Sequence, residues 1–337
     1  MNKIQQNISL KPYNTFGIDV NASYFISIED ETHLIEILKG NTLPLFLISG
    51  GSNMLLTKNI DALVMHINTK GIKVEPKKDY ALVTAKAGEN WHDFVQFCIN
   101  KNLGGLENLS LIPGCVGSAP IQNIGAYGVE LKDCFVSCKA LHRETLQTKE
   151  FFKEDCEFGY RNSIFKNEAK NKYIITEVTF KLSSENHKLH TAYGAIQNQL
   201  VENKVANPTI KDVAEAVIAI RKSKLPDPNE LGNSGSFFKN PVIPVEQYDE
   251  VKKKFPEIPH YPVSENLVKV PAGWLIDQAG FKGYSYKNAG VHSKQALVLI
   301  NKTGNATGNE IWELAQLIQT KIKEIYTISL EAEVNVF

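Results

Sequence analysis

Hydrophobic and polar positions along the chain predict both strands and helices. Residues 45–48, Leu-Phe-Leu-Ile, form a short apolar run that ends in Ser49-Gly50-Gly51-Ser52-Asn53, as a buried strand does when it breaks into a tight loop. Apolar residues at helical spacing follow Asn90, a residue type favoured as an N-cap. The same criteria predict strands at 62–67, 81–87, 134–141, 173–182 and 296–301, and helices at 31–39, 211–222, 245–254, 272–279 and 308–325. Because these elements lack a regular strand–helix–strand alternation, we expect an α+β fold with mixed sheets.

The end of the chain alternates strictly with period two from Ile328 to Val336. The positions facing one way are Ile328, Leu330, Ala332, Val334 and Val336, and those facing the other are Ser329, Glu331, Glu333 and Asn335. This pattern predicts a closing strand with one apolar face. Two glutamates share the polar face, and the alternation does not distinguish between them.

Residues 104–128 differ from the rest of the chain because they contain six glycines, two prolines and almost no charge. Composition alone would suggest a flexible linker. Seven aliphatic side chains would then be left in water, namely Leu106, Leu109, Leu111, Ile112, Val116, Ile121 and Ile124. We therefore expect a structured loop that packs against a large apolar surface.

Length and charge narrow the class of protein. A chain of 337 residues is longer than one hydrophobic core usually organises, so we expect two or three lobes, with the best boundary at the proline-rich segment 224–228. The 37 basic and 37 acidic residues cancel, which argues against a protein that binds nucleic acid or a membrane surface. The N-terminal residues also lack the apolar core of a signal peptide.

The cysteines and histidines indicate neither disulfides nor a metal site. Five cysteines are an odd number and form no CxxC pair, so we expect free thiols, with Cys134 and Cys138 buried, in a cytoplasmic protein. His187 and His190 have i, i+3 spacing, but no third ligand lies near them in the sequence. No metal is expected.

Two glycine-bearing loops are the candidates for ligand binding, because the chain lacks P-loop, Rossmann, zincin and serine-hydrolase motifs. In residues 50–53 the backbone N–H groups could approach a phosphate closely, although a plain turn after a strand also explains this segment. Residues 113–128 offer small residues for close approach, amides for the edge of a heterocycle and apolar side chains for its face. Together the two loops favour a large, flat, phosphate-bearing cofactor.

With these loops the chain closely resembles the UDP-N-acetylenolpyruvoylglucosamine reductases, flavoenzymes that make UDP-N-acetylmuramate for peptidoglycan. The resemblance covers nearly the whole chain. It rests, in chain order, on residues 13–17, 51–53, 112–128, 160–166, 224–228, 235–241, 272–280, 291–292 and 330–334. Ala192-Tyr193-Gly194 also looks like the tyrosine-bearing insertion of the type I branch of the family.

The resemblance implies an α+β fold of the vanillyl-alcohol-oxidase type, in which two lobes bind FAD non-covalently and a third binds substrate. The expected domains are FAD-binding lobe 1 at 1–67, lobe 2 at 68–223 completed by 326–337, and the substrate-binding domain at 224–325. NADPH would reduce the flavin, and a hydride would then pass from flavin N5 to C3 of UDP-N-acetylglucosamine-enolpyruvate. We expect a monomer whose partners are small molecules, with no nucleic acid or membrane.

The resemblance also assigns roles to individual residues. Arg161 and Glu333 would flank the substrate carboxylate, and Ser236 would protonate C2. FAD would contact Gly50, Gly51, Ser52, Asn53, Met54, Ser118, Gln122, Asn123 and Gly125. The sugar nucleotide would contact Tyr193, Lys224, Asn240, Tyr261 and Gln295. His292 is expected to be structural.

The residues alone leave simpler interpretations open. Arg161 could be a surface arginine, Ser236 a turn or cap serine, and Glu333 a solvated residue on the polar face of a strand. Lys224 could complement the dipole at the end of a helix. The family pattern places the functional carboxylate directly before a valine, and this selects Glu333 over Glu331.

Two departures from the family pattern bear on the site. Ser49 stands where a glycine is frequent, and Asn335 stands where an arginine is usual. We expect FAD binding to survive the first change, whereas the second removes a positive charge. Two rival functions remain: an oxidase of the same fold and, because Asn335 replaces the arginine, a UDP-sugar-binding protein without catalytic activity.

Overall fold

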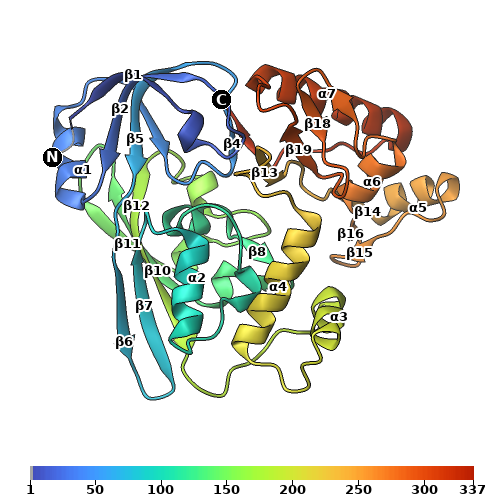
Figure 1. The fold of residues 1–337 in the computed structure, drawn as a ribbon, viewed down its shortest axis with the longest axis horizontal. Coiled ribbons are helices and arrows are strands. Elements are labelled where there is room, and N and C mark those ends of the chain that lie inside the picture. The colour runs from blue at the N-terminus through green and yellow to red at the C-terminus, as the bar shows by residue number, and fades with distance from the viewer. Residues whose placement is uncertain (1–2) are drawn as a thin grey trace. The chain divides into compact units, whose positions relative to one another are not determined.

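The computed structural model describes residues 3–337, which form two compact units (Figure 1). Unit 1 contains the described residues up to Ile8 together with 23–50 and 61–223, and unit 2 contains 9–22, 51–60 and 224–337. The predicted boundary at 224–228 therefore coincides with the start of the last segment of unit 2. The finer division into two FAD-binding lobes and a substrate-binding domain remains a prediction.

The first sheet of unit 1 has four strands. Its order is β1 (Gln5–Ser9), β2 (Asn21–Ile28), β5 (Ile60–Ile67) and β3 (Leu45–Ile48), with β3 and β5 parallel. Helix α1 (Glu31–Gly40) begins at Asp30, whose side chain accepts a hydrogen bond from the N–H of His33. Its Leu34 and Leu38 join the apolar cluster formed by residues of β2 and β5. The strand predicted at 45–48 and the helix predicted at 31–39 are confirmed.

The second sheet of unit 1 has five antiparallel strands. Its order is β11 (Thr148–Phe152), β10 (Phe135–His142), β12 (Tyr173–Ser183), β7 (Tyr80–Lys86) and β6 (Ile72–Pro76). Helix α2 (Trp91–Asn100) begins at Asn90, as predicted, and Trp91 packs edge-on against Phe180. The indole N–H of Trp91 donates to the carbonyl oxygen of Leu109 at 2.9 Å, which attaches the glycine-rich segment to this core.

The glycine-rich segment 104–128 is structured. It contains the short helices η2 (Glu107–Leu109) and η3 (Val116–Gln122) and the strand β8 (Gly125–Ala126), which pairs with β9 (Val129–Glu130) in a hairpin. Leu106, Leu109 and Val116 are fully buried in the core of unit 1, as predicted. Ile121 was expected to be buried and is 39% exposed, because it lies near the end of η3, where the chain turns.

Two helices complete unit 1. Helices α3 (Gly194–Glu202) and α4 (Ile210–Lys224) share an apolar cluster of Ile196, Leu200, Ala216, Val217 and Ile220. The sequence predicted α4 but not α3, a helix of nine residues that begins with glycine. Tyr193, the tyrosine of the proposed type I insertion, immediately precedes α3.

Unit 2 contains two small sheets, a two-stranded pair formed by the end of the chain, and three α-helices. One sheet has the order β13 (Asn233–Ser236), β19 (Val298–Asn301), β18 (Ala289–Val291) and β17 (Ser285–Tyr286), and the other has β14 (Val242–Pro244), β16 (Leu267–Lys269) and β15 (Tyr261–Pro262). The helices are α5 (Val245–Lys254), α6 (Ala272–Gln278) and α7 (Gly308–Tyr326), as predicted to within a few residues. Helix α7 begins with a capping box of Thr307 and Glu310 and packs on β18 and β19.

The closing segment keeps the predicted alternation in burial but not the predicted strand. Ile328, Leu330 and Val334 are buried, whereas only β20 (Asn335–Val336) is a strand, and it pairs in parallel with β4 (Met54–Leu55). The preceding residues contact 237–239 through single hydrogen bonds, so they form no continuous ladder. The terminal strand thus pairs with residues 54–55 (Figure 1), and the assignment of 326–337 to lobe 2 remains a prediction.

The structure agrees with the expectation of free thiols. All five cysteines are unpaired, and Cys134 and Cys138 are buried as predicted. Within the described chain, residues 3–337, no helix is both long and apolar enough to span a lipid bilayer. The same residues contain no group of histidine, cysteine or acidic side chains that could hold a metal ion.

Candidate active site

The two glycine-bearing loops meet in unit 1. Gly50 follows the end of β3, and a Cβ atom placed on it would lie 2.7 Å from the Cα atom of Gly114 and 3.0 Å from its carbonyl carbon. Atoms without a covalent or hydrogen bond between them do not approach so closely. The two backbones can therefore touch only because Gly50 lacks a side chain. Segments that the sequence presented as separate candidates are parts of one structure.

The rest of the first loop is held within unit 2. Gly51 has a φ of +58°, and a Cβ atom there would lie 2.0 Å from the carbonyl oxygen of Tyr13. The N–H of Thr15 donates to the carbonyl oxygen of Gly51 at 3.1 Å. This explains why residues 13–17 and 51–53 recur together in the family resemblance: the first segment fixes the backbone of the second.

Both departures from the family pattern fit the structure. The φ of Ser49 lies outside the left-handed region, so the serine does not strain the turn, but its hydroxyl is buried without a hydrogen-bond partner. Asn335 donates to the carbonyl oxygen of Asn53 from its backbone N–H at 3.2 Å and from its side chain at 3.0 Å. The residue that replaces the usual arginine therefore holds the end of the glycine loop.

Asn123 stabilises the second loop through its side chain. This residue has a φ of 43° and is fully buried. Its amide nitrogen donates to Glu130 at 3.0 Å and to the carbonyl oxygen of Gly159 at 3.1 Å, and its amide oxygen accepts from the N–H of Lys132 at 3.0 Å. An amide with all these groups engaged has little left for a ligand. The side chain of Asn123 supports the loop, and its contact with FAD remains a prediction.

Arg161 lies against the second loop rather than on the open surface. Its φ is +52°, a left-handed conformation that is uncommon for a residue other than glycine. Its Nη2 donates to the carbonyl oxygen of Gly125 at 2.8 Å, and its guanidinium lies 5.8 Å from the ring of Tyr160. Lys166 donates to the carbonyl oxygen of Arg161 at 3.2 Å. The strained backbone and the half-buried guanidinium are both held in place.

Ser236 and Glu333 belong to neighbouring segments of unit 2. Ser236 ends β13, and its side chain is exposed directly after Gly235, whose φ is +68°. The N–H of Glu333 donates to the carbonyl oxygen of Phe237 at 2.8 Å. Glu331 is 75% exposed and forms an ion pair with Lys239 at 3.2 Å. The structure thus separates the two glutamates that the alternation could not distinguish, and it brings Glu333 next to the strand of Ser236.

The predicted sugar-nucleotide residues occupy several places. In unit 2, the side chain of Asn240 accepts from the N–H of Ala272 at the start of α6, and Gln295 lies close to Gly273 of the same helix. Tyr261 is 57% exposed on β15. Lys224 is the last residue of α4 and is exposed. In unit 1, Tyr193 is 54% exposed beside α3.

His187 contacts neighbouring side chains, whereas the Nδ1 atom of His292 has no hydrogen-bond partner. His187 contacts Ser183 at 2.7 Å and Asn102 at 3.2 Å, which accounts for it without a metal. The Nδ1 atom of His292 is buried without a hydrogen-bond partner, and burial lowers the pKa of this imidazole. A cationic role for His292 is therefore unfavourable.

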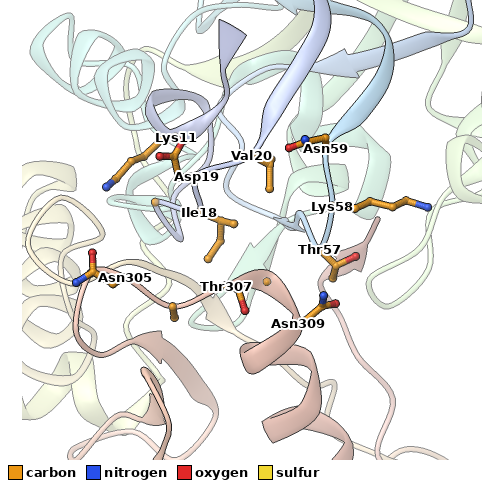
Figure 2. Close-up of a pocket in the computed structure, with 14 residues that line it drawn as sticks. Lys11, Ile18, Asp19, Val20, Thr57, Lys58, Asn59, Asn305, Thr307 and Asn309 are labelled. Atoms are coloured by element: carbon orange, nitrogen blue, oxygen red, sulfur yellow. The ribbon is translucent and has the colours of Figure 1, made fainter. Parts of the chain in front are cut away.

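A pocket in unit 2 involves none of the predicted site residues (Figure 2). The cavity measures about 430 Å³ and lies beside the start of α7, where Thr307 and Asn309 line it. Lys11 and Lys58 are on opposite sides of it and point outward. It contains no buried charged side chain that would indicate a ligand.

Sequence reasoning missed two residues of unit 1, Tyr127 and Arg221. Tyr127 contacts the ring of Tyr193, with 5.4 Å between ring centroids, and the Arg221 guanidinium lies near the hydroxyl of Tyr127. An arginine near the end of a helix gives no signal of this role. The amino-acid composition does draw attention to Arg221, because arginine is rare in the chain.

Comparison with known proteins agrees with these observations. Residues 22–144 match the FAD binding domain family, and residues 227–337 match the C-terminal domain of UDP-N-acetylenolpyruvoylglucosamine reductase. The first match includes both Gly50 and Gly114, so the region where the two loops meet lies inside a FAD-binding domain. This agrees with a cofactor-binding site formed by backbone atoms.

Relatives cover the whole chain. The UDP-N-acetylenolpyruvoylglucosamine reductase of Flavobacterium johnsoniae is 56% identical over 336 residues, and that of Pseudomonas aeruginosa is 46% identical over 339 residues, each covering 99% of both chains. The solved structure of the UDP-N-acetylenolpyruvylglucosamine reductase from Thermus caldophilus covers 100% of both chains with 22% identity and a TM-score of 0.69. That likeness confirms the predicted α+β FAD-binding fold. The chain is an oxidoreductase with a FAD-binding domain, and it belongs to the UDP-N-acetylenolpyruvoylglucosamine reductase family.

Proposed function

We propose that this protein reduces UDP-N-acetylglucosamine-enolpyruvate to UDP-N-acetylmuramate in peptidoglycan precursor synthesis, with NADPH as the electron donor. The observation that carries the proposal is the meeting of the two glycine loops at Gly50 and Gly114, inside the region that matches a FAD-binding domain. The full-length likeness to reductases of this name supports the substrate. The free cysteines suit a reducing compartment, and we place the enzyme in the cytoplasm.

FAD would be held by Gly50, Gly51, Ser52, Asn53 and Met54 and by residues of the second loop. Glycines allow the backbone N–H groups of the first loop to come close to the diphosphate. Ser118, Gln122 and Gly125 of the second loop would contact the cofactor directly, and Asn123 would keep that loop in shape. Bound FAD would supply the redox chemistry by accepting a hydride from NADPH and delivering it to C3 of the enolpyruvyl group.

Arg161 would stabilise the negative charge that reduction places on the substrate carboxylate. A guanidinium presents parallel N–H donors and stays charged, so it suits a carboxylate better than a lysine does. One donor aimed at developing charge is worth about 3–4 kcal/mol of the barrier. The hydrogen bond to the carbonyl oxygen of Gly125 fixes the orientation of this guanidinium, and this limits its reorganisation during the reaction.

Ser236 would donate the proton to C2, and Glu333 would flank the carboxylate. Gly235 permits the positive φ that precedes Ser236, and the exposed hydroxyl is available to a substrate. A positioned general acid contributes about 10²–10⁴-fold in rate. Serine is a weak acid, but the carbon to be protonated is strongly basic. The hydrogen bond from Glu333 to Phe237 supports the assignment of both residues to the same reaction.

The sugar nucleotide would be recognised by Tyr193, Lys224, Asn240, Tyr261 and Gln295. Lys224 offers a compact charge on a flexible stem, which suits a diphosphate. Tyr193 and Tyr261 are both more than half exposed, so their rings are available to a ligand.

The decisive experiment follows the visible spectrum of the purified protein under anaerobic conditions. Addition of NADPH should bleach the flavin absorption, and addition of UDP-N-acetylglucosamine-enolpyruvate should restore it. An oxidase of the same fold would be reoxidised rapidly by oxygen and not by the enolpyruvyl sugar. A UDP-sugar-binding protein without activity would show no NADPH oxidation that depends on the enolpyruvyl substrate. Either result would refute the proposal.

A further inference from the structure

Arginine is rare in this chain and is found only at constrained positions. Of the 37 basic residues, three are arginines: Arg143, Arg161 and Arg221. Each donates to a backbone carbonyl oxygen, Arg143 to Asn171 at 2.9 Å, Arg161 to Gly125 at 2.8 Å and Arg221 to Leu111 at 3.2 Å. Lysine replaces arginine poorly where a planar group with several donors must bridge fixed acceptors. Arg161 has a proposed role in the reaction, whereas Arg221 has none so far.

Arg221 contacts two strained points of the glycine-rich segment. Its Nε donates to the carbonyl oxygen of Leu111 at 3.2 Å, and its guanidinium lies near the hydroxyl of Tyr127. Leu111 has a φ of +59° and Tyr127 a φ of +50°. Left-handed conformations of such large residues persist only where neighbouring groups hold them. Arg221 is one of these groups at Leu111, and its guanidinium lies beside the side chain of Tyr127.

Other contacts fix the same two residues from different elements. The N–H of Leu111 donates to Nδ1 of His92 on α2 at 3.0 Å, and the side chain of Asn108 donates to the carbonyl oxygen of Tyr127 at 3.1 Å. The ring of Tyr127 also packs against the apolar cluster of α3 and α4. Tyr127 is therefore held at its backbone and its ring, and the Arg221 guanidinium lies near its hydroxyl.

Tyr127 in turn contacts Tyr193. Their ring centroids are 5.4 Å apart and their planes meet at 86°, the edge-to-face arrangement that aromatic pairs favour. Tyr193 is 54% exposed and lies immediately before α3, so its ring has few constraints from a core. The orientation of Tyr193 therefore depends on Tyr127, and that of Tyr127 depends on Arg221.

We propose that Arg221 is a positioning residue that, through Tyr127, orients Tyr193 for binding the UDP moiety of the sugar nucleotide. This inference rests on the proposed function, which makes Tyr193 a substrate-binding residue. In this proposal Arg221 does not contact the ligand. Loss of Arg221 should therefore weaken binding by the same route as loss of Tyr193.

The test is a double-mutant cycle on the full-length protein with bound FAD. The dissociation constant of UDP is measured by calorimetry for the wild type, Arg221→Met, Tyr127→Phe, Tyr193→Ala and the double variant Arg221→Met/Tyr193→Ala. Tyr127→Phe keeps the ring and removes only the hydroxyl, so it tests the relay without disturbing the core. Arg143→Met is the matched control, because Arg143 also donates to a backbone carbonyl oxygen in unit 1 but contacts neither tyrosine.

Arg221→Met and Tyr127→Phe should each raise the dissociation constant by about 3- to 10-fold, the scale of an edge-to-face aromatic pair. The double variant should bind no more weakly than Tyr193→Ala alone, because residues that act through one another are not additive. In turnover the defect should appear mainly as a higher KM for the sugar nucleotide. Arg143→Met should bind UDP as the wild type does.

Two results would overturn the inference while the wild type binds UDP. In one, the effects of Arg221→Met and Tyr193→Ala multiply in the double variant, which would mean that they act independently. In the other, Tyr127→Phe binds UDP normally although Tyr193→Ala does not. Failure of the wild-type protein to bind UDP would refute the proposed function, and this inference with it.

Discussion

Substitution of Gly50 by alanine tests the meeting of the two loops. The new Cβ atom would lie 2.7 Å from the Cα atom of Gly114 and 3.3 Å from the nitrogen of Cys115, and all of these neighbours are backbone atoms. Ordinary carbon contacts are about 3.5–4.0 Å, so the loops would have to separate by about 1 Å. Overpacking of this kind costs about 1–3 kcal/mol of stability.

The same displacement should weaken FAD binding. Loss of one hydrogen bond between a backbone N–H group and a charged phosphate costs about 1.5–3 kcal/mol. That free energy corresponds to a rise of about 10- to 100-fold in the dissociation constant. The assay is the quenching of flavin fluorescence when FAD is titrated into apoprotein, together with urea unfolding of the apoprotein.

Gly40→Ala is the matched control for this experiment. Gly40 ends α1 in the same unit, and a Cβ atom there would meet nothing within 4 Å. Alanine is a better helix former than glycine, so the control should be neutral or slightly stabilising and should bind FAD normally. If Gly50→Ala bound FAD as tightly as Gly40→Ala does, the reasoning about the two loops would be wrong.

Four further predictions concern the catalytic groups and the cysteines. Ser236→Ala should leave the flavin reducible by NADPH yet lower turnover by about 10²-fold or more, and unchanged turnover would exclude the proton-donor role. Arg161→Lys should lower kcat by about tenfold or more, because a point charge cannot replace a two-pronged contact, so wild-type kinetics would remove the argument for a bidentate clamp. Burial raises the pKa of the Cys98 thiol to about 12 and also raises that of Cys134, so both should resist thiol reagents until the protein unfolds. Cys115, half-exposed beside Gly114, should react in the folded apoprotein, and FAD should slow this labelling; equal rates with and without FAD would place the cofactor elsewhere.

Much of the fold could be predicted because local patterns coincide with burial. The run at 45–48 is strand β3 to the residue, and α7 differs from its predicted range by a single residue. Helix α3 could not be predicted, because nine residues with a glycine start form a helix only against α4. For the closing strand, the sequence predicts burial but not strand pairing. Its alternation correctly indicates which side chains are buried, but hydrogen-bond partners depend on the rest of unit 2.

The candidate site was predictable in its parts rather than in its arrangement. Glycine content drew attention to both loops, but the approach of Gly50 to Gly114 depends on packing between distant segments. Glu333 and Glu331 were equivalent in the pattern until the ion pair with Lys239 accounted for Glu331. The amide of Asn123 could recognise a heterocycle, and only the tertiary structure shows that its side chain forms hydrogen bonds within the protein.

The most direct test of the central claim is the flavin content of the purified wild-type protein. The protein should be yellow, and heat denaturation should release about one equivalent of unmodified FAD per chain into the supernatant. A colourless preparation that takes up no FAD when the cofactor is supplied in excess would contradict the account.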